Sequence, residues 1–207
     1  MNDIGIIVLA AGGSSRMGQP KQLLRWGDST LLRTTLDAAL QTHCAAVIAV
    51  LGAQYERIKA EVPPSVHIVQ NEQWQRGMHT SIASGVSALL RINPAVHAAI
   101  LTIADQPLIA PSIFEALAGF YHLNSRPICA AAYANTLGTP ALFDAQFFGE
   151  LQALTSGGAQ TMILKHRELV GEVAWPNGEF DIDTPEDYER LQAASHSGIG
   201  YLGIDLP

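Results

Sequence analysis

The chain has 207 residues, of which 48% are hydrophobic and 15% are charged, and its formal net charge is −7. This length suits one domain with a full hydrophobic core, and the acidic balance argues against nucleic acid or an anionic membrane as the main partner. Cys44 and Cys129 lie too far apart in the sequence to indicate a disulfide framework or a zinc cluster, and the seven histidines show no metal-ligand spacing.

The first predicted element is a buried strand at residues 4–8, which leads directly into a glycine-rich turn at residues 9–21. Glycine tolerates positive φ and leaves no Cβ in the way, so the backbone N–H groups of such a turn can converge on an anion. Arg16 and Lys21 add two cations within the same loop. The loop therefore favours a polyphosphate ligand, with an ordinary turn carrying two surface cations as the structural alternative.

This loop differs from two common phosphate loops. The Walker pattern requires Gly-Lys-Ser/Thr, but Gly18 is followed by Gln19 and Pro20, and the dinucleotide pattern G-x-G-x-x-G is absent.

The start of the chain also lacks the basic region of a signal peptide, because Asp3 stands there. No apolar run reaches the ~18 residues of a membrane span, so the sequence predicts a cytoplasmic protein without a membrane partner.

Strand-like and helical runs alternate along the rest of the chain. Periodicity and capping residues predict helices at 31–39, 54–60 and 81–90 and one that opens at 111–112, and they predict strands at 45–51, 66–69, 98–103 and 128–132. This alternation predicts an α/β fold, a single Rossmann-like domain at residues 1–194 with a mostly parallel sheet and helices on both faces. The glycine-rich tail, 195–207, is either loose or packs on a neighbouring surface through Ile199, Tyr201 and Leu202.

Two carboxylate positions are candidates for a metal site at the carboxyl edge of the sheet, where ligands of such folds bind. Asp105 follows the strand at 98–103 and is either a turn residue or a ligand for a hard cation; the loop on the same edge favours the ligand. Mg²⁺ suits it, because Mg²⁺ usually takes one or two carboxylates together with phosphate oxygens and water. In an extended segment Asp181 and Asp183 face the same way. We predict Asp181 as the second metal ligand and Asp183 as local turn support.

The residues after this pair predict the start of a helix. Thr184 is a good N-cap, Pro185 suits the first helical position, and Asp187 completes a reciprocal cap resembling a capping box. Thr184 and Asp187 are therefore interpreted as structural. Trp74 is likewise interpreted as a packing residue in preference to a base-stacking one, and His79 as neutral lining.

The segment Leu9–Leu24, LAAGGSSRMGQPKQLL, resembles the signature of the nucleotidyltransferases that act on molybdenum cofactor, the MobA-like NTP transferases, and is nearest to the molybdopterin cytidylyltransferase branch. The resemblance spans about residues 4 to 192, and its further blocks follow in the family's order at 71–81, 104–107, 138–140 and 181–187. It implies a fold like that of nucleotide-diphospho-sugar transferases. It also implies a Mg²⁺-dependent transfer of CMP from CTP to molybdopterin with release of pyrophosphate, and a molybdenum enzyme as a further recipient.

The resemblance also implies roles for individual residues. Lys21, Arg16 and Asp105 would be catalytic, and Asp105 and Asp181 would bind the metal. The nucleotide would lie against Leu9, Ala10, Ala11, Gly12, Gly13, Ser14, Arg16, Lys21, Asn71, Gly77 and Ser81. CTP is predicted over GTP, because guanylyl-transferring relatives usually have glycine where this chain has Ala11 and methionine where it has Gln106.

One block departs from the family pattern. Where the family usually carries Gly-Asp-x-Gly-Ala-Arg, this chain reads SGGAQ at Ser156–Gln160, without the acid and the arginine. The identity of the acceptor is therefore open, and a sugar or polyol phosphate is the nearest alternative. A nucleotide or cofactor carrier without turnover is the alternative from another class, although binding alone would not need both Lys21 and Asp105.

Overall fold

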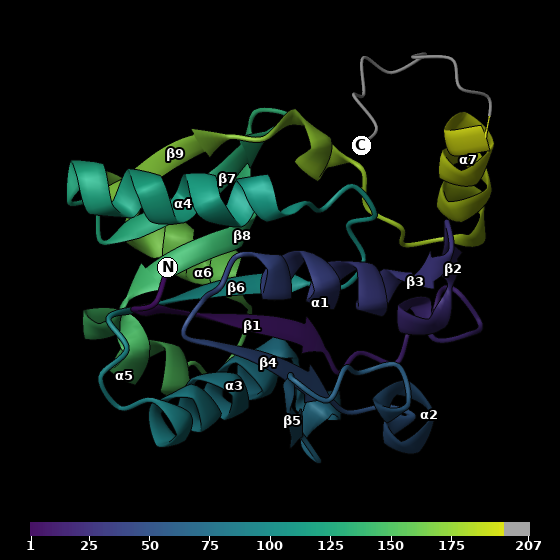
Figure 1. Ribbon diagram of the computed structural model, residues 1–207, viewed down its shortest axis with the longest axis horizontal. Coiled ribbons are helices and arrows are strands. Elements are labelled where there is room, and N and C mark those ends of the chain that lie inside the picture. Colours follow the sequence, from purple (N-terminus) through teal and green to yellow (C-terminus); the bar gives the residue numbers. More distant parts are fainter. Residues whose placement is uncertain (197–207) are drawn as a thin grey trace.

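A seven-stranded sheet with the strand order β5-β4-β1-β6-β8-β7-β9 crosses the molecule (Figure 1). The computed structural model describes residues 1–196. The sheet consists of β1 (Ile4–Ala10), β4 (Ala46–Leu51), β5 (His67–Gln70), β6 (Ala98–Ile103), β7 (Ile128–Tyr133), β8 (Thr136–Asp144) and β9 (Val170–Ala174). β8 runs antiparallel to β6 and β7, whereas the other pairings are parallel. The prediction of a mostly parallel α/β sheet is confirmed.

Helices cover both faces of this sheet (Figure 1). One face packs against α1 (Leu31–Gln41), α2 (Tyr55–Lys59) and α4 (Pro111–Asn124), and the other against α3 (Met78–Ile92), α5 (Phe148–Gln152) and α6 (Ala159–Lys165). Along β1, Ile6 and Val8 point into the first layer while Ile7 and Leu9 point into the second. Burial on both sides explains why this strand is an unbroken apolar run.

The last described helix, α7 (Pro185–His196), lies apart from these layers beside the small hairpin of β2 (Arg25–Trp26) and β3 (Ser29–Thr30) (Figure 1). A separate apolar cluster joins them, in which Leu191 of α7 packs with Leu24 and Ile182. The cap predicted for this helix is confirmed, because the Asp187 carboxylate accepts hydrogen bonds from the Thr184 N–H and hydroxyl. Short 3₁₀ turns occupy Lys21–Leu23, Trp74–Arg76, Ala145–Phe147, Arg167–Leu169 and Pro176–Glu179.

Between residues 133 and 180, where the sequence pattern predicts no element, the structure contains β8, α5, α6 and β9. Gly138 and Pro140 inside β8 are typical of turns, which hides this strand from a pattern search. The pairing of β7 with β8 shifts register between Ala130 and Ala131, and such irregular pairing accommodates a proline within a sheet. The predicted helix at 81–90 also begins earlier than expected, at Met78.

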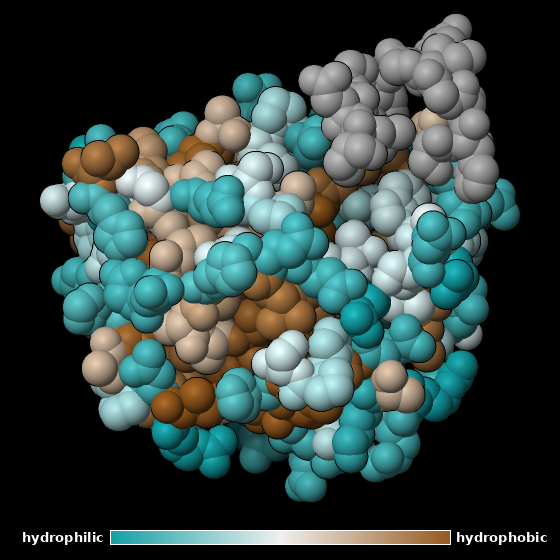
Figure 2. Space-filling view, viewed as in Figure 1, coloured by the Kyte–Doolittle hydropathy of each residue, from teal (hydrophilic) through white to brown (hydrophobic). Residues whose placement is uncertain are grey.

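The carboxyl ends of β1, β4 and β6 lie at one edge of the sheet, where the loop after β1 and the Asp105 turn after β6 both emerge. Figure 2 shows mostly polar side chains over the face that carries α1 and α4, with hydrophobic atoms reaching the surface in a band below α1. No helix among residues 1–196 is long and apolar enough to cross a membrane. α7 continues to His196, past the predicted domain boundary at 194, and the contacts considered for Ile199, Tyr201 and Leu202 lie outside the described residues.

Candidate functional site

The loop after β1 is held open by its own hydrogen bonds. Ser14 adopts a left-handed conformation with φ of 52°, and its Oγ accepts a hydrogen bond from the Lys21 N–H at 2.9 Å. A Cβ on Gly12 would meet no atom of residues 1–196 within 4 Å, so there is open space beside this glycine that a ligand could occupy. At Gly13 an added Cβ would instead lie 3.1 Å from the Trp74 ring, and Trp74 is partly buried against the apolar layer that contains Ala11.

Gln22 supports this loop from below and was not among the predicted site residues. Its side chain is only 5% exposed, and its Nε2 donates hydrogen bonds to the carbonyl oxygens of Ala10 and Gly12, each at 2.9 Å. A buried amide with two backbone partners fixes the path of the chain on both sides of Ala11. Gln22 stands next to Lys21 in a loop rich in polar residues, so its residue type alone did not distinguish it in the sequence.

We expect Gln22→Leu to weaken triphosphate binding by about 10-fold while the domain stays folded. The buried Ala10 carbonyl and the part-buried Gly12 carbonyl both lose their donor, and an unpaired buried acceptor costs ~1–3 kcal/mol. Isothermal calorimetry with a nucleoside triphosphate would measure the loss. Gln19→Leu is the matched control, since Gln19 is an exposed glutamine of the same loop. Equal affinities for the two variants would show that Gln22 does not set the loop.

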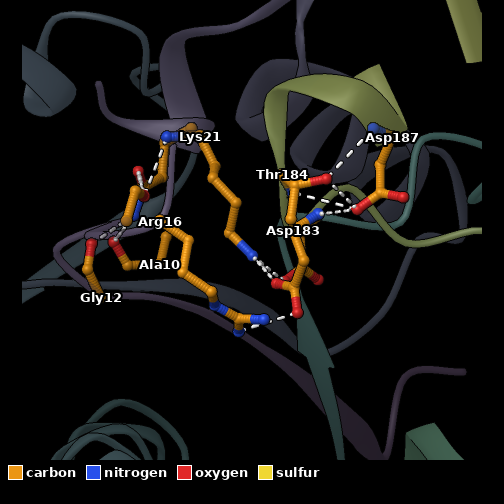
Figure 3. Close-up of polar contacts among 10 residues, drawn as sticks. Ala10, Gly12, Arg16, Lys21, Asp183, Thr184 and Asp187 are labelled. Atoms are coloured by element: carbon orange, nitrogen blue, oxygen red, sulfur yellow. Dashed lines mark hydrogen bonds and ion pairs between the residues drawn. The ribbon is translucent and has the colours of Figure 1, made fainter. Parts of the chain in front are cut away.

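Lys21 lies at the centre of a charged cluster at the mouth of the loop (Figure 3). Its Nζ is 2.7 Å from Asp105 Oδ2 and 2.7 Å from Asp183 Oδ1, and Arg16 reaches Asp183 Oδ2 at 2.8 Å. Burial alone would lower the pKa of Lys21, but the Asp105 and Asp183 carboxylates outweigh it and raise that pKa. Lys21 is therefore a fixed positive charge at physiological pH.

The interpretation of Asp183 as turn support is wrong. Its carboxylate accepts hydrogen bonds from Lys21 and Arg16, and the hydrogen bond from Lys21 is the main reason that its pKa lies below the ordinary value. Alternation along the extended segment was expected and explains the position: Ile182 is buried, and its N–H donates to the Asp105 carbonyl at 2.9 Å. The pattern could not tell which of the two flanking carboxylates meets the lysine.

Asp181, two residues before Asp183, is exposed. Partial loss of hydration, followed by the negative charges of Asp105 and Asp183, raises its pKa above the ordinary value. Asp181 therefore lies in the electrostatic field of the cluster, although the ion pairs that this segment makes with the loop, among residues 1–196, belong to Asp183. Its role as a metal ligand stays a prediction.

A cavity of about 310 Å³ opens beside the loop. Asp105 and Asp183 line it, and so do six of the residues predicted to bind nucleotide: Leu9, Ala10, Gly12, Ser14, Arg16 and Lys21. Met78 at the start of α3 also contributes, which the sequence analysis did not foresee. The predicted phosphate loop, its two cations and the strand-end carboxylate are thus brought to one cavity.

Five other residues predicted to bind nucleotide do not line that cavity: Ala11, Gly13, Asn71, Gly77 and Ser81. The Asn71 Nδ2 donates hydrogen bonds to the hydroxyls of Thr80 and Ser81, and its Oδ1 accepts one from the Gln73 N–H. Asn71 and Ser81 are each 4% exposed. In this structure their polar groups hold the start of α3 in place against the chain that precedes it.

Known proteins resemble this chain over most of its length. Residues 6–170 match the model of the MobA-like NTP transferase domain. The chain is 27% identical to molybdenum cofactor cytidylyltransferase of Escherichia coli (strain K12), over 91% of this chain and 95% of that protein. It is 29% identical to nicotine blue oxidoreductase of Paenarthrobacter nicotinovorans, over 89% of this chain and 94% of that protein. The crystal structure of Mycobacterium tuberculosis H37Rv Rv0371c in complex with manganese has a TM-score of 0.77 at 31% identity, covering 93% of this chain and 99% of that one.

Proposed function

This chain belongs to the MobA-like NTP transferase domain family and is a nucleotidyltransferase, and from that premise we propose that it transfers CMP from CTP to molybdopterin or molybdenum cofactor, releasing pyrophosphate. The observation that carries the proposal is the cluster of Lys21, Arg16 and Asp105 at the mouth of the loop cavity. The similarity to molybdenum cofactor cytidylyltransferase extends over most of both chains, and it supports the choice of CTP as donor and molybdopterin as acceptor. A cytoplasmic location belongs to the same proposal.

The loop provides the binding site for the triphosphate. Its open backbone beside Gly12 leaves room for phosphate oxygens, and Lys21 and Arg16 supply positive charge from one side of the cavity. Arg16 is largely exposed, with 68% of its side chain accessible, so it can turn from Asp183 to an arriving phosphate. Lys21 is far more enclosed and holds its position.

The residues present fit a divalent cation. Asp105 Oδ1 is buried and has no hydrogen-bond partner among the described residues, while Oδ2 is paired with Lys21. A buried carboxylate oxygen without a partner is costly unless a ligand completes it. We propose that Asp105 and Asp181 hold Mg²⁺, with substrate phosphates and water as the other ligands, an arrangement usual for this ion. When bound, the ion would offset negative charge on the phosphates.

The protein then contributes mainly by positioning the two substrates, and no covalent intermediate with a side chain is needed. An oxygen of the acceptor phosphate attacks the α-phosphorus of CTP, a new phosphorus–oxygen bond forms, and the bond to the β-phosphate oxygen breaks so that pyrophosphate leaves. Lys21, fixed near Asp105, stabilises the charge that develops on the phosphoryl oxygens, and the loop holds the triphosphate in line.

We expect CTP to bind more tightly than GTP, by about 1–3 kcal/mol or roughly 10- to 200-fold, the scale of a modest difference in pocket shape. The support is the resemblance at Ala11 and Gln106. Ala11 is 5% exposed and its methyl group packs into the apolar layer beneath the loop. The methyl group would therefore affect nucleotide selection by shifting the loop backbone. Calorimetry with each triphosphate and Mg²⁺ tests this, and Ala11→Gly should narrow the difference. Equal or tighter GTP binding would indicate a guanylyltransferase.

The reaction itself is tested by pyrophosphate release from a panel of triphosphates and acceptors, with molybdopterin and several sugar and polyol phosphates included. Release that depends on CTP and molybdopterin supports the proposal. If pyrophosphate is released with a sugar or polyol phosphate but not with molybdopterin, the acceptor in the proposal is wrong and the nucleotidyl transfer stands. Tight nucleotide binding without release under any combination would indicate a carrier.

A further inference from the structure

A second cavity of about 440 Å³ adjoins the loop cavity. The two share Met78 and Ile103, so a molecule whose phosphate lies against the loop can extend from one into the other. Its remaining walls come from Tyr133 and from two segments, Gly138–Thr139 in β8 and Gly157–Gln160 at the start of α6. This position is where the body of an acceptor would lie during transfer.

Among residues 1–196, none of those that line this second cavity carries a charge. The sequence has no charged residue from Ala153 to Leu164, a stretch that includes the Gly157–Gln160 wall of the cavity. The charged groups that act on the Tyr133 hydroxyl are the carboxylates of Asp181 and Asp105. A second anion placed here would be desolvated and repelled, because the described part of the lining offers no cation to offset the cost.

Neutral hydrogen-bonding groups are available instead. Gln160 is exposed at the rim and offers an amide, and Tyr133 offers a hydroxyl. The tyrosine is held in place, because its ring packs edge-on against Trp175 with centroids 6.1 Å apart. Burial and the neighbouring carboxylates raise the pKa of Tyr133, so its hydroxyl remains a neutral donor.

Two glycines let the side chains of the cavity wall pack closely against the backbone. A Cβ at Gly138 would collide with the Tyr133 hydroxyl, and one at Gly158 would lie 2.7 Å from the Met78 sulfur. Both glycines therefore allow the side chains that form the walls to come close to the backbone. The result is a neutral, polar space that continues from a strongly charged one.

We propose that the part of the acceptor that enters this cavity, beyond its reacting phosphate, is uncharged, a ring or polyol held by neutral hydrogen bonds to Gln160 and the Tyr133 hydroxyl. The inference rests on the proposed nucleotidyl transfer and narrows its acceptor. Glutamine at position 160 selects by hydrogen bonding, whereas an arginine at this position would select by charge.

The test uses product-like ligands, so it does not depend on turnover. CDP, CDP-glucose and CDP-glucuronic acid are titrated into the protein with Mg²⁺; the two sugar compounds differ only by a carboxylate in place of a hydroxymethyl group. We expect CDP-glucose to bind at least as tightly as CDP and CDP-glucuronic acid to bind about 10-fold more weakly than CDP-glucose, or worse. Gln160→Arg should remove or reverse this preference, and Gln160→Leu, which adds no cation, should keep it.

The outcomes separate the two proposals. If CDP itself does not bind, the nucleotide proposal fails. If CDP binds and CDP-glucuronic acid equals or exceeds CDP-glucose, or neither sugar compound binds, the inference about the acceptor fails while the nucleotide site stands. A wild-type preference that Gln160→Arg leaves unchanged would overturn the assignment of Gln160.

Discussion

Asp105→Asn is expected to lower the rate of nucleotidyl transfer by at least about 100-fold, the scale observed when a preorganised charge stabiliser is removed. The carboxylate is the point where the loop cavity, Lys21 and the proposed Mg²⁺ meet. Its Oδ1 is buried without a partner among the described residues, so the charge serves a ligand more than it serves the fold. Asparagine has nearly the same volume, and the backbone hydrogen bond from Ile182 to the Asp105 carbonyl is unaffected.

The measurement combines pyrophosphate release with thermal unfolding of the same preparation. Asp37→Asn is the matched control, because Asp37 is an exposed carboxylate on α1 that pairs with Arg33 far from the cavity. A folded Asp105→Asn protein with near-normal turnover would remove Asp105 from the metal site. Loss of activity together with a large fall in melting temperature would point to a structural role instead.

The sequence was informative wherever a residue's role followed from local chemistry. The apolar run at 4–8 predicted a buried strand, and every residue of β1 is buried. The glycine-rich turn and strand-end position of Asp105 predicted a shared edge, because parallel strands place their carboxyl ends together. Thr184 and Asp187 form the predicted cap, which depends on residues three apart. These are interactions of short range or of simple topology.

What the sequence did not reveal depends on contacts between distant segments. Asp183 meets Lys21 across 162 positions of the chain, and no local pattern distinguishes it from Asp181. Gln22 acts by reaching back to the carbonyls of Ala10 and Gly12 once the loop has closed. The strand β8 was not predicted, because Gly138 and Pro140 interrupt the residue pattern that a strand normally shows. Each requires the fold before its role can be seen.

Lys21→Ala is expected to lower kcat/KM by about 100-fold or more, by weakening triphosphate binding and slowing the chemical step together. Lys21 is a compact charge only 17% exposed, placed between Asp105 and Asp183 at 2.7 Å from each. Without it the carboxylates repel each other and the incoming phosphates. Lys21→Arg should also be poor, because a broad planar guanidinium cannot occupy the position of an ammonium group between two carboxylates.

A double variant separates the two contributions of Lys21. If part of its effect is neutralisation of the cluster, Lys21→Ala combined with Asp183→Asn should recover some nucleotide affinity, since one negative charge is removed. The rate should stay low, because the fixed ammonium group at position 21 is still missing. Calorimetry and single-turnover kinetics would measure the two quantities separately. Lys59→Ala is the control, since Lys59 lies on α2 beside Tyr55 and away from the cavity. Unchanged affinity and rate in Lys21→Ala would make the loop an ordinary turn and leave the cluster without a role in transfer.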